Sequence, residues 1–180
     1  MKKRSMSELQ RLTVDEFKSS EKWPLVIILD NIRSQNNTGS VFRTSDAFRL
    51  RRIYLCGITA TPPHREIQKT ALGATESVDW TYRASTLEAL AELKAEGYRI
   101  MAVEQAQGAV SLPAFTPHAG EKLALVFGNE VNGIDDEALS ACDGCIEIPQ
   151  FGTKHSINVS VAVGIVIWDL FLKTRKERGL

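Results

Sequence analysis

Short, continuous apolar runs are the feature that most constrains the fold of this chain. Leu25–Leu29 and Leu123–Phe127 contain no polar residue, and strands of this kind are buried on both faces, as in a parallel sheet. Further strand patterns lie at 53–56, 77–82, 99–103 and 145–148, and helical patterns lie at 39–48, 66–72, 85–96, 135–141 and 156–176. This alternation predicts an α/β fold: a single domain with a mostly parallel sheet covered by helices on both faces.

Size and composition fit one globular domain. The chain has 180 residues, of which 43% are hydrophobic and 24% charged, and these values are ordinary for a globular protein. No apolar run is long enough to cross a membrane, and no apolar segment follows the charged residues at the start. We therefore expect a cytoplasmic protein that has no membrane partner.

The start of the chain is expected to lie outside the core of this domain. Residues 6–19 carry apolar side chains at helical spacing, which predicts an amphipathic helix. No neighbouring element in the sequence offers this helix a partner, so it is expected to pack on the outside of the domain or on another subunit. The predicted division is an N-terminal helical extension, residues 1–22, followed by the main domain, residues 23–180.

The cysteines indicate neither disulfides nor a metal. There are three, an odd number, which argues against a disulfide framework. Cys142 and Cys145 form a single Cys-x-x-Cys pair, and a zinc site needs further ligands. We expect this pair to be structural, and we expect no metal.

The net charge is zero, but the charges are unevenly distributed. Between residues 33 and 52 a single acid, Asp46, stands against the arginines at positions 33, 43, 49, 51 and 52. A localised basic face can hold a polyanion, and Arg49, Arg51 and Arg52 are its best candidates. The other interpretation is a set of solvated helix faces, and composition does not separate the two.

The first polar segment of interest follows the first apolar strand. Asn37 or Thr38 is expected to cap the next helix, and Gly39 permits close backbone approach. Arg43 lies one to two turns into that helix and carries a planar fork of donors suited to phosphate. The alternative is a surface arginine that pairs with Asp46.

The second polar segment, Phe127–Gly133, directly follows another strand. Its two glycines suggest a tight loop that presents backbone groups to a ligand. It lacks the Gly-Lys-Ser/Thr of a phosphate-binding P-loop, and the chain lacks the Gly-x-Gly-x-x-Gly of a dinucleotide site. Taken alone, Glu130 fits a helix-capping acid better than a catalytic one.

The third polar segment connects the last strand to the last helix. Pro149 cannot donate a ladder hydrogen bond and is expected to end the strand. Ser156 is a good N-cap for the closing helix. A strand, a loop and a helix N-terminus in this order are where α/β proteins bind ligands.

The order and content of these three segments resemble the three motifs of the SpoU/TrmH family, the RNA ribose 2′-O-methyltransferases of the SPOUT class. The matching residues are Asn37, Arg43, Phe127-Gly128-Asn129-Glu130, Gly133, Ile148-Pro149 and Ser156-Ile157-Asn158. The resemblance covers about residues 26–172 and includes the connecting run 69–74. It implies that residues 23–180 form a SPOUT methyltransferase domain, in which the closing segment forms a C-terminal trefoil knot.

The resemblance also implies a cofactor, S-adenosylmethionine, held at three strand ends largely by backbone groups. Ile148 and Ile157 would sandwich the adenine, and Gly128 would let the backbone come close. Gln150 and Ile157 stand where the family usually has methionine and leucine, and Gln150 puts the side-chain packing at its position in doubt. The implied cofactor-binding residues are Val103, Glu104, Phe127, Gly128, Asn129, Ile148, Ser156 and Ile157.

The family's central catalytic role falls on Arg43. A guanidinium pKa above about 12 makes a neutral arginine costly, so we favour phosphate binding and electrostatic lowering of the hydroxyl pKa over a general-base role. The residues that would position Arg43 and the ribose are Asn37, Glu130, Ser156 and Asn158. The implied RNA-binding residues are Arg43, Arg49, Arg51 and Arg52.

The expected function is therefore RNA ribose 2′-O-methylation by a homodimer. We favour tRNA over rRNA as the substrate, because no further substrate-binding domain is visible in the sequence. Three alternatives stay open: a non-catalytic RNA-binding or assembly factor on the same fold, base methylation, and a nucleotide-binding α/β domain of unrelated chemistry.

Overall fold

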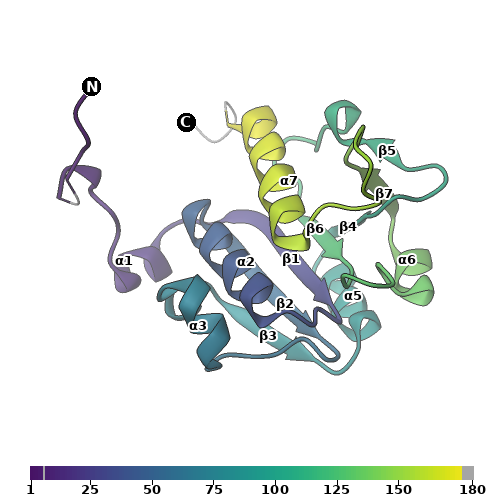
Figure 1. The fold of residues 1–180 in the computed structure, drawn as a ribbon, viewed down its shortest axis with the longest axis horizontal. Coiled ribbons are helices and arrows are strands. Elements are labelled where there is room, and N and C mark those ends of the chain that lie inside the picture. The colour runs from purple at the N-terminus through teal and green to yellow at the C-terminus, as the bar shows by residue number, and fades with distance from the viewer. Residues whose placement is uncertain (6, 176–180) are drawn as a thin grey trace.

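A computed structural model describes residues 1–5 and 7–175, and one parallel sheet forms its centre (Figure 1). Within these residues seven strands lie in the order β3-β2-β1-β6-β4-β7-β5, and all neighbours are parallel. They are β1 (Trp23–Asp30), β2 (Leu50–Cys56), β3 (Trp80–Arg83), β4 (Arg99–Val103), β5 (Val110–Ser111), β6 (Leu123–Phe127) and β7 (Gly144–Glu147). The predicted α/β class is confirmed, and β4 and β6 have the predicted bounds.

Helices cover both faces of the sheet, as predicted (Figure 1). The helices on one face are α2 (Gln35–Ala47), α3 (Arg65–Ala71), α4 (Ala74–Ser77) and α7 (Val159–Thr174). Those on the other face are α5 (Thr86–Ala95) and α6 (Asp136–Ala141). The remaining helical elements are η1 (Ser7–Leu9), α1 (Val14–Ser19) and η2 (Leu112–Ala114). No helix in the part of the chain that the structure describes is long and apolar enough to cross a membrane.

Strand β1 explains why this sheet is covered on both faces. Leu25, Ile27 and Leu29 pack in one apolar core with α2, α3 and α7, whereas Val26 and Ile28 pack in a second core with α5. All of these side chains are 1% exposed or less. Burial of a side chain of this size contributes about 1.5–3 kcal/mol, so neither face of β1 can be left to solvent.

Helix α2 begins earlier than predicted. Its N-cap is Ser34, whose Oγ accepts a hydrogen bond from the Asn37 backbone N–H at 3.2 Å. The expected caps, Asn37 and Thr38, lie inside the first turn, and the predicted start at Gly39 is wrong. Several residues in this segment are good N-caps, and a sequence pattern does not choose between them.

Helix α7 begins later than predicted, at Val159. Asn158 is its N-cap, with Oδ1 accepting a hydrogen bond from the Ser160 N–H at 3.0 Å. Strand β7 ends at Glu147, so residues 148–157 form one long loop. Ser156 is therefore a loop residue, and its predicted role as the N-cap is wrong.

The N-terminal segment is not the single helix predicted over residues 6–19. It contains η1 and α1, and Gln10 between them has a left-handed φ of 46°. Thr13 begins α1 with a capping box: its side chain accepts a hydrogen bond from the Glu16 N–H, and the Glu16 carboxylate accepts one from the Thr13 N–H at 2.7 Å. Met6, the first residue of the predicted helix, lies outside the described residues.

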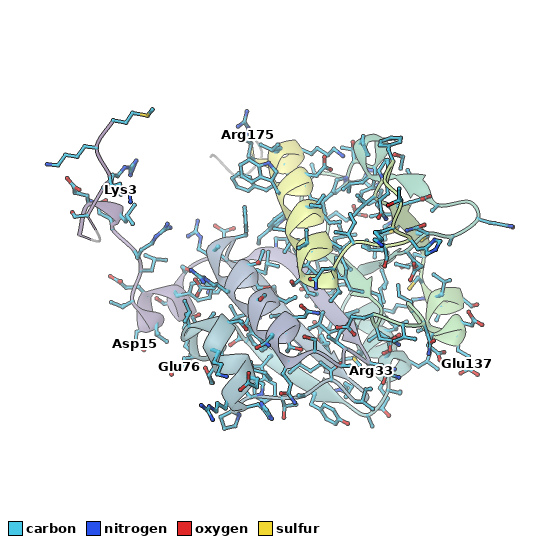
Figure 2. All side chains as sticks on the ribbon, in the orientation of Figure 1. Lys3, Asp15, Arg33, Glu76, Glu137 and Arg175 are labelled. Carbon is cyan, nitrogen blue, oxygen red and sulfur yellow. The ribbon has the colours of Figure 1, made fainter. Side chains whose placement is uncertain are left out.

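This first part of the chain projects from the body of the domain. Figure 2 shows Lys3 and Asp15 on a segment beside the α3 side of the molecule. Helix α1 packs against α4 and buries Phe17, which is 5% exposed. The extension is thus anchored by one aromatic side chain, and its boundary at residue 22 stays a prediction.

Helices α2 and α3 approach each other closely at Gly39. A Cβ atom at this position would lie 2.2 Å from both the Ile67 backbone oxygen and Thr70 Oγ1. Thr70 Oγ1 also donates a hydrogen bond to the Asn36 carbonyl at 2.9 Å. The close approach that Gly39 permits is therefore a contact between two helices. Together with the hydrogen bond from Thr70 to Asn36, this contact holds the first turn of α2 against α3.

Gly39→Ala is expected to lower the free energy of unfolding by about 1–3 kcal/mol, because the added methyl group overpacks this contact. Gly164→Ala is the matched control, since a Cβ atom there meets nothing within 4 Å. At a helical position with open space for a Cβ atom, alanine is neutral or stabilises by up to about 1 kcal/mol. Urea denaturation measures both changes, and equal stability of the two variants would contradict the packing role of Gly39.

Candidate active site

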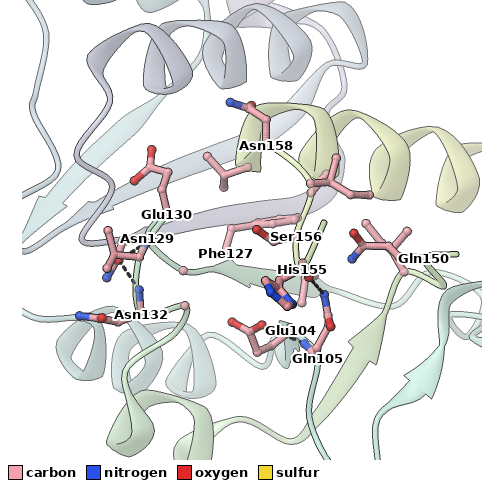
Figure 3. A pocket seen from close by; sticks show the side chains of 18 residues that line it. Glu104, Gln105, Phe127, Asn129, Glu130, Asn132, Gln150, His155, Ser156 and Asn158 are labelled. Carbon is pink, nitrogen blue, oxygen red and sulfur yellow. Dashed lines mark hydrogen bonds between the residues drawn. The ribbon is translucent and has the colours of Figure 1, made fainter. Parts of the chain in front are cut away.

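A cleft of about 540 Å³ lies at the carboxyl ends of β4, β6 and β7 (Figure 3). It brings together all of the residues predicted to bind the cofactor, together with Glu130 and Asn158. Its lining residues are Val103, Glu104, Gln105, Phe127, Gly128, Asn129, Glu130, Val131, Asn132, Gly133, Ile148, Gln150, His155, Ser156, Ile157, Asn158, Val159 and Ala162. The second and third motif segments therefore line a single cleft, as the carboxyl ends of parallel strands allow.

The loop after β6 is held in shape by its own hydrogen bonds. Asn129 and Gly133 exchange two backbone hydrogen bonds, of 3.0 and 3.1 Å. Asn129 Oδ1 accepts two more, from the N–H groups of Val131 and Asn132, both at 2.9 Å. The side-chain oxygen of Asn129 is thus committed to the loop, as its hydrogen bond toward Asn132 shows (Figure 3).

Gly128 is required by this loop itself. A Cβ atom at Gly128 would lie 2.1 Å from both the Gly133 carbonyl carbon and the Ile134 nitrogen. The close backbone approach expected at this glycine is therefore made by residues of the same loop. Any side chain here would force the loop open and change the wall of the cleft.

Glu104 connects the end of β4 to the neighbouring loops. Its Oε2 accepts a hydrogen bond from the Ile134 N–H at 3.2 Å, and its Oε1 accepts one from the Gln105 N–H at 2.9 Å. Gln105 Nε2 in turn donates to the His155 carbonyl at 2.5 Å. These contacts hold the three walls of the cleft together.

Asn37, Glu130 and Asn158 form a hydrogen-bonded cluster at the edge of the cleft. Asn37 Nδ2 donates to Glu130 Oε1 at 2.9 Å, and Asn158 Nδ2 donates to Asn37 Oδ1 at 3.2 Å. Glu130 Oε2 also accepts the Arg33 backbone N–H at 3.3 Å. These groups come from the three separate motifs, so the structure brings together side chains that are far apart in the sequence.

The pKa of Glu130 lies below its ordinary value. Partial burial raises the pKa of this carboxyl. Hydrogen bonds from the Asn37 side chain and from backbone N–H groups, including that of Arg33, lower the pKa, and together they outweigh the effect of burial. Donors that face a carboxylate favour its charged form. Glu130 is thus held as an anion beside the first turn of α2.

Two predicted catalytic residues do not line the cleft: Asn37 is hydrogen-bonded to residues at its edge, and Arg43 lies further away. It lies nearly two turns further along α2 than Asn37, a rise of about 9 Å, and its side chain is exposed. Within the described residues it forms no ion pair: Asp46, its suggested partner, accepts a hydrogen bond from the Ser77 hydroxyl. A cationic fork is therefore left free on the outer face of α2.

The predicted basic patch is divided. Arg52 is half-buried and bound to α5, with salt bridges to Glu92 at 3.7 Å and Glu96 at 3.5 Å. Arg49 and Arg51 lie at the amino end of β2, whereas the cleft lies at the carboxyl ends of the strands. The patch and the cleft thus lie at opposite ends of the parallel strands. Arg52, bound in its salt bridges, is not free to contact RNA.

Some residues that line the cleft were not assigned to the site from the sequence. They are Gln105, Val131, Asn132 and His155; of these, His155 was expected to face solvent or RNA phosphate, and its position next to the third motif was the available signal. Behind the cleft, Asp30 is 1% exposed and accepts hydrogen bonds from the Thr86 hydroxyl at 2.6 Å and the Asp135 N–H at 3.0 Å. An acid that directly follows a wholly apolar strand is the pattern that marks it.

The cysteines take no part in this site. Cys56, Cys142 and Cys145 are free thiols. Burial raises the pKa of the Cys142 thiol to about 11, which makes it a poor nucleophile and a poor metal ligand. Among the described residues no group of three or more His, Cys, Asp and Glu side chains is arranged to hold a metal ion.

The parallel sheet and the cleft at its carboxyl edge define an α/β ligand-binding protein. The chain belongs to the SpoU rRNA Methylase family, whose model matches residues 24–168. The expectation from the three motifs is thus confirmed at the level of the family.

Relatives and solved structures resemble this chain over most of its length. It is 30% identical over 166 residues to a 23S rRNA (guanosine-2′-O-)-methyltransferase of Neisseria meningitidis, covering 92% of this chain and 64% of that protein. It is 27% identical over 180 residues to a tRNA (guanosine(18)-2′-O)-methyltransferase of Thermus thermophilus, covering 98% and 89%. An AdoMet-bound rRNA methyltransferase from Sinorhizobium meliloti superposes with a TM-score of 0.77 at 25% identity, covering 91% and 61%. The chain thus spans less than two thirds of the Neisseria and Sinorhizobium proteins.

Asn37→Ala is expected to raise the pKa of Glu130 toward its ordinary value of 4.5, because it removes the strongest hydrogen bond that lowers this pKa. A carboxyl with a depressed folded-state pKa stabilises the fold above its unfolded-state pKa, and this contribution is lost as the pH falls through the folded-state pKa. The variant should therefore lose stability at neutral pH, and the loss should shrink in acid.

Carbon-detected NMR of the Glu130 carboxyl gives its pKa, and urea denaturation at two pH values gives the stability. Asn36→Ala, at an exposed neighbouring position, is the control. A stability loss of the same size at pH 7 and in strong acid would contradict this account of the Asn37–Glu130 contact.

Proposed function

We propose that this protein is an S-adenosylmethionine-dependent RNA methyltransferase that acts on a ribose 2′-hydroxyl. The observation that carries the proposal is the cleft lined by the second and third motif segments, to which the first is joined through the Asn37–Glu130–Asn158 cluster. Its relatives from Neisseria and Thermus are named for 2′-O-methylation of rRNA and tRNA. Retention of polar residues in all three motifs favours an enzyme over a non-catalytic assembly factor.

The residues of the cleft suit S-adenosylmethionine. Val103, Phe127, Ile148 and Ile157 offer apolar contacts for an adenine ring, and the loops supply backbone donors and acceptors. A volume of about 540 Å³ lies within the range of small-molecule sites. Gln150, which replaces the family's usual methionine, also lines the cleft and offers an amide to a polar part of the cofactor.

When bound, S-adenosylmethionine would supply a methyl group that is already activated by its positively charged sulfur. The protein's part is to place the ribose and to stabilise the developing negative charge on its oxygen. Asn37, Glu130 and Asn158 hold one another at the edge of the cleft, and Ser156 lines it. Arg43 binds RNA phosphate and lowers the pKa of the hydroxyl by its charge.

A second copy of the chain is proposed to bring Arg43 to the cleft. Helix α7 carries an exposed apolar stripe at helical spacing: Val161 is 49% exposed, Ile165 38%, Trp168 52% and Leu172 42%. The side chain of Arg43 is exposed on α2, which packs directly beside α7. A homodimer formed through this stripe would bury it and place Arg43 at the interface. The trefoil knot of the closing segment remains a prediction of the family resemblance.

For the substrate we favour tRNA over rRNA. The Thermus relative, named for tRNA, aligns with 98% of this chain. Arg49 and Arg51 are the remaining candidates for a remote phosphate contact. We accordingly propose that the activity is cytoplasmic.

The first test is binding and transfer. Calorimetry should show binding of S-adenosylmethionine and S-adenosylhomocysteine, and total RNA from a strain that lacks the protein should take up label from a radioactive donor. Nucleoside analysis should find the label on a ribose of tRNA. RNA binding without either cofactor would instead support an assembly factor, and label on a base would support base methylation.

The second test addresses the shared site. An Arg43→Ala protomer mixed with a Gly128→Val protomer, whose cofactor loop is blocked, should recover part of the activity that each variant lacks alone. Each mixed dimer then has one intact site. If heterodimers form, as native mass spectrometry can show, and activity stays absent, then Arg43 does not act across the interface.

A further inference from the structure

Phe151 is exposed to an unusual degree for an aromatic residue in an ordered domain. It is 97% exposed, more than any other large hydrophobic residue in the described chain except Met1. Large apolar side chains gain stability by burial, and aromatic residues left in water next to a ligand site are frequently binding groups. Phe151 therefore requires an explanation that the fold of one chain does not provide.

The loop that carries Phe151 is held loosely by the rest of the protein. In the part of the chain that the structure describes, no hydrogen bond involves residues 149–154. The nearest anchor is the bond from Gln105 Nε2 to the His155 carbonyl. The polar backbone groups of this segment, like the ring of Phe151, are thus available to a ligand.

The surroundings of Phe151 are polar, cationic and next to the cleft. Gln150 and His155, on either side of it in the loop, both line the cleft. Lys154 is exposed, and no acidic residue lies between positions 148 and 168. An exposed aromatic ring and a lysine in one loop, next to a site proposed to act on a nucleotide, are groups of the kind that single-stranded nucleic acids bind.

We propose that Phe151 is a stacking platform for an RNA base next to the methylated nucleotide, and that Lys154 contacts the adjoining phosphate. This inference rests on the proposed RNA methyltransferase activity. Unpaired bases stack on aromatic side chains with little sequence preference. The stacked base fixes the strand at the mouth of the cleft and leaves the target ribose to the Asn37–Glu130–Asn158 cluster.

Two other occupants of this ring are less well supported. A contact with a second copy of the chain calls for a contiguous apolar patch, and the neighbours of Phe151 in the loop are Gln150, Gly152, Thr153 and Lys154. The apolar stripe of α7 already offers a surface of that kind. A cover over the cofactor would need the ring to face the cleft, and Phe151 is not among the lining residues.

The test compares Phe151→Ala, Phe151→Leu and Phe151→Trp in full-length protein. The probes are total tRNA from a strain that lacks the protein, dodecauridylate, and an abasic ribose-phosphate chain of the same length. We expect Phe151→Ala and Phe151→Leu to raise the Kd for tRNA and dodecauridylate about tenfold, as loss of one stacked base would. Phe151→Trp should keep the wild-type Kd, and no variant should differ on the abasic chain.

The controls separate this inference from the proposed function. Leu87→Ala changes an exposed apolar residue of α5, on the far side of the sheet, and should leave every Kd unchanged. Calorimetry with S-adenosylhomocysteine and native mass spectrometry should give wild-type cofactor affinity and dimer mass for all Phe151 variants. If wild-type protein methylates RNA and the alanine variant binds RNA equally well, the stacking role is refuted.

Two further results would also overturn the stacking role. Weaker dimerisation of Phe151→Ala would identify the ring as a contact between copies, and weaker cofactor binding would identify it as a cover of the cleft. Failure of wild-type protein itself to bind RNA would remove the proposed function and this inference with it. Since the wild-type measurement comes first, these failures are distinguishable.

Discussion

The order of the parallel strands is the constraint on which the site depends. Strand β6 lies between β1 and β4, and β7 lies beside β4, so loops from distant parts of the sequence leave the sheet side by side. The hydrogen bonds of Asn37 to Glu130 and to Asn158 span sequence separations of 93 and 121 residues. Such contacts exist because the apolar cores on both faces of the sheet fix where each strand ends.

The sequence predicts the fold well where burial alone decides the structure. Strands β4 and β6 have the predicted bounds, and the helical pattern at 85–96 forms α5, for which Ser85 is the N-cap and accepts a hydrogen bond from the Glu88 N–H at 3.3 Å. The starts of α2 and α7 were misplaced because each segment offers several possible caps. In the folded protein Asn37 and Asn158 make hydrogen bonds to residues far away in the sequence, and these contacts go together with the caps that are observed. A local sequence pattern does not contain such contacts. The short strand β5 has no pattern of its own.

The site was located by the motifs, but the roles of individual residues needed the structure. Arg52 looks like its neighbour Arg51 in the sequence, yet its partners Glu92 and Glu96 lie on α5, and no periodicity reveals that pairing. Gly128 looks like a ligand-binding glycine, yet its own loop requires it. A motif therefore specifies which residues gather, while packing decides which of them remain free to act.

One side of the cleft is fixed by hydrogen bonds and another is loosely held, and this asymmetry suits the proposed two-substrate reaction. Glu104, Asn129 and Glu130 are each bound by at least two hydrogen bonds from neighbouring groups, so that wall is preorganised and a ligand there pays little ordering entropy. The loop of residues 149–154 has no such bonds among the described residues. A small cofactor gains most from the fixed wall, because its few contacts must be in place in advance. A flexible RNA strand brings many contacts of its own, and these can offset the cost of ordering the loop as it binds.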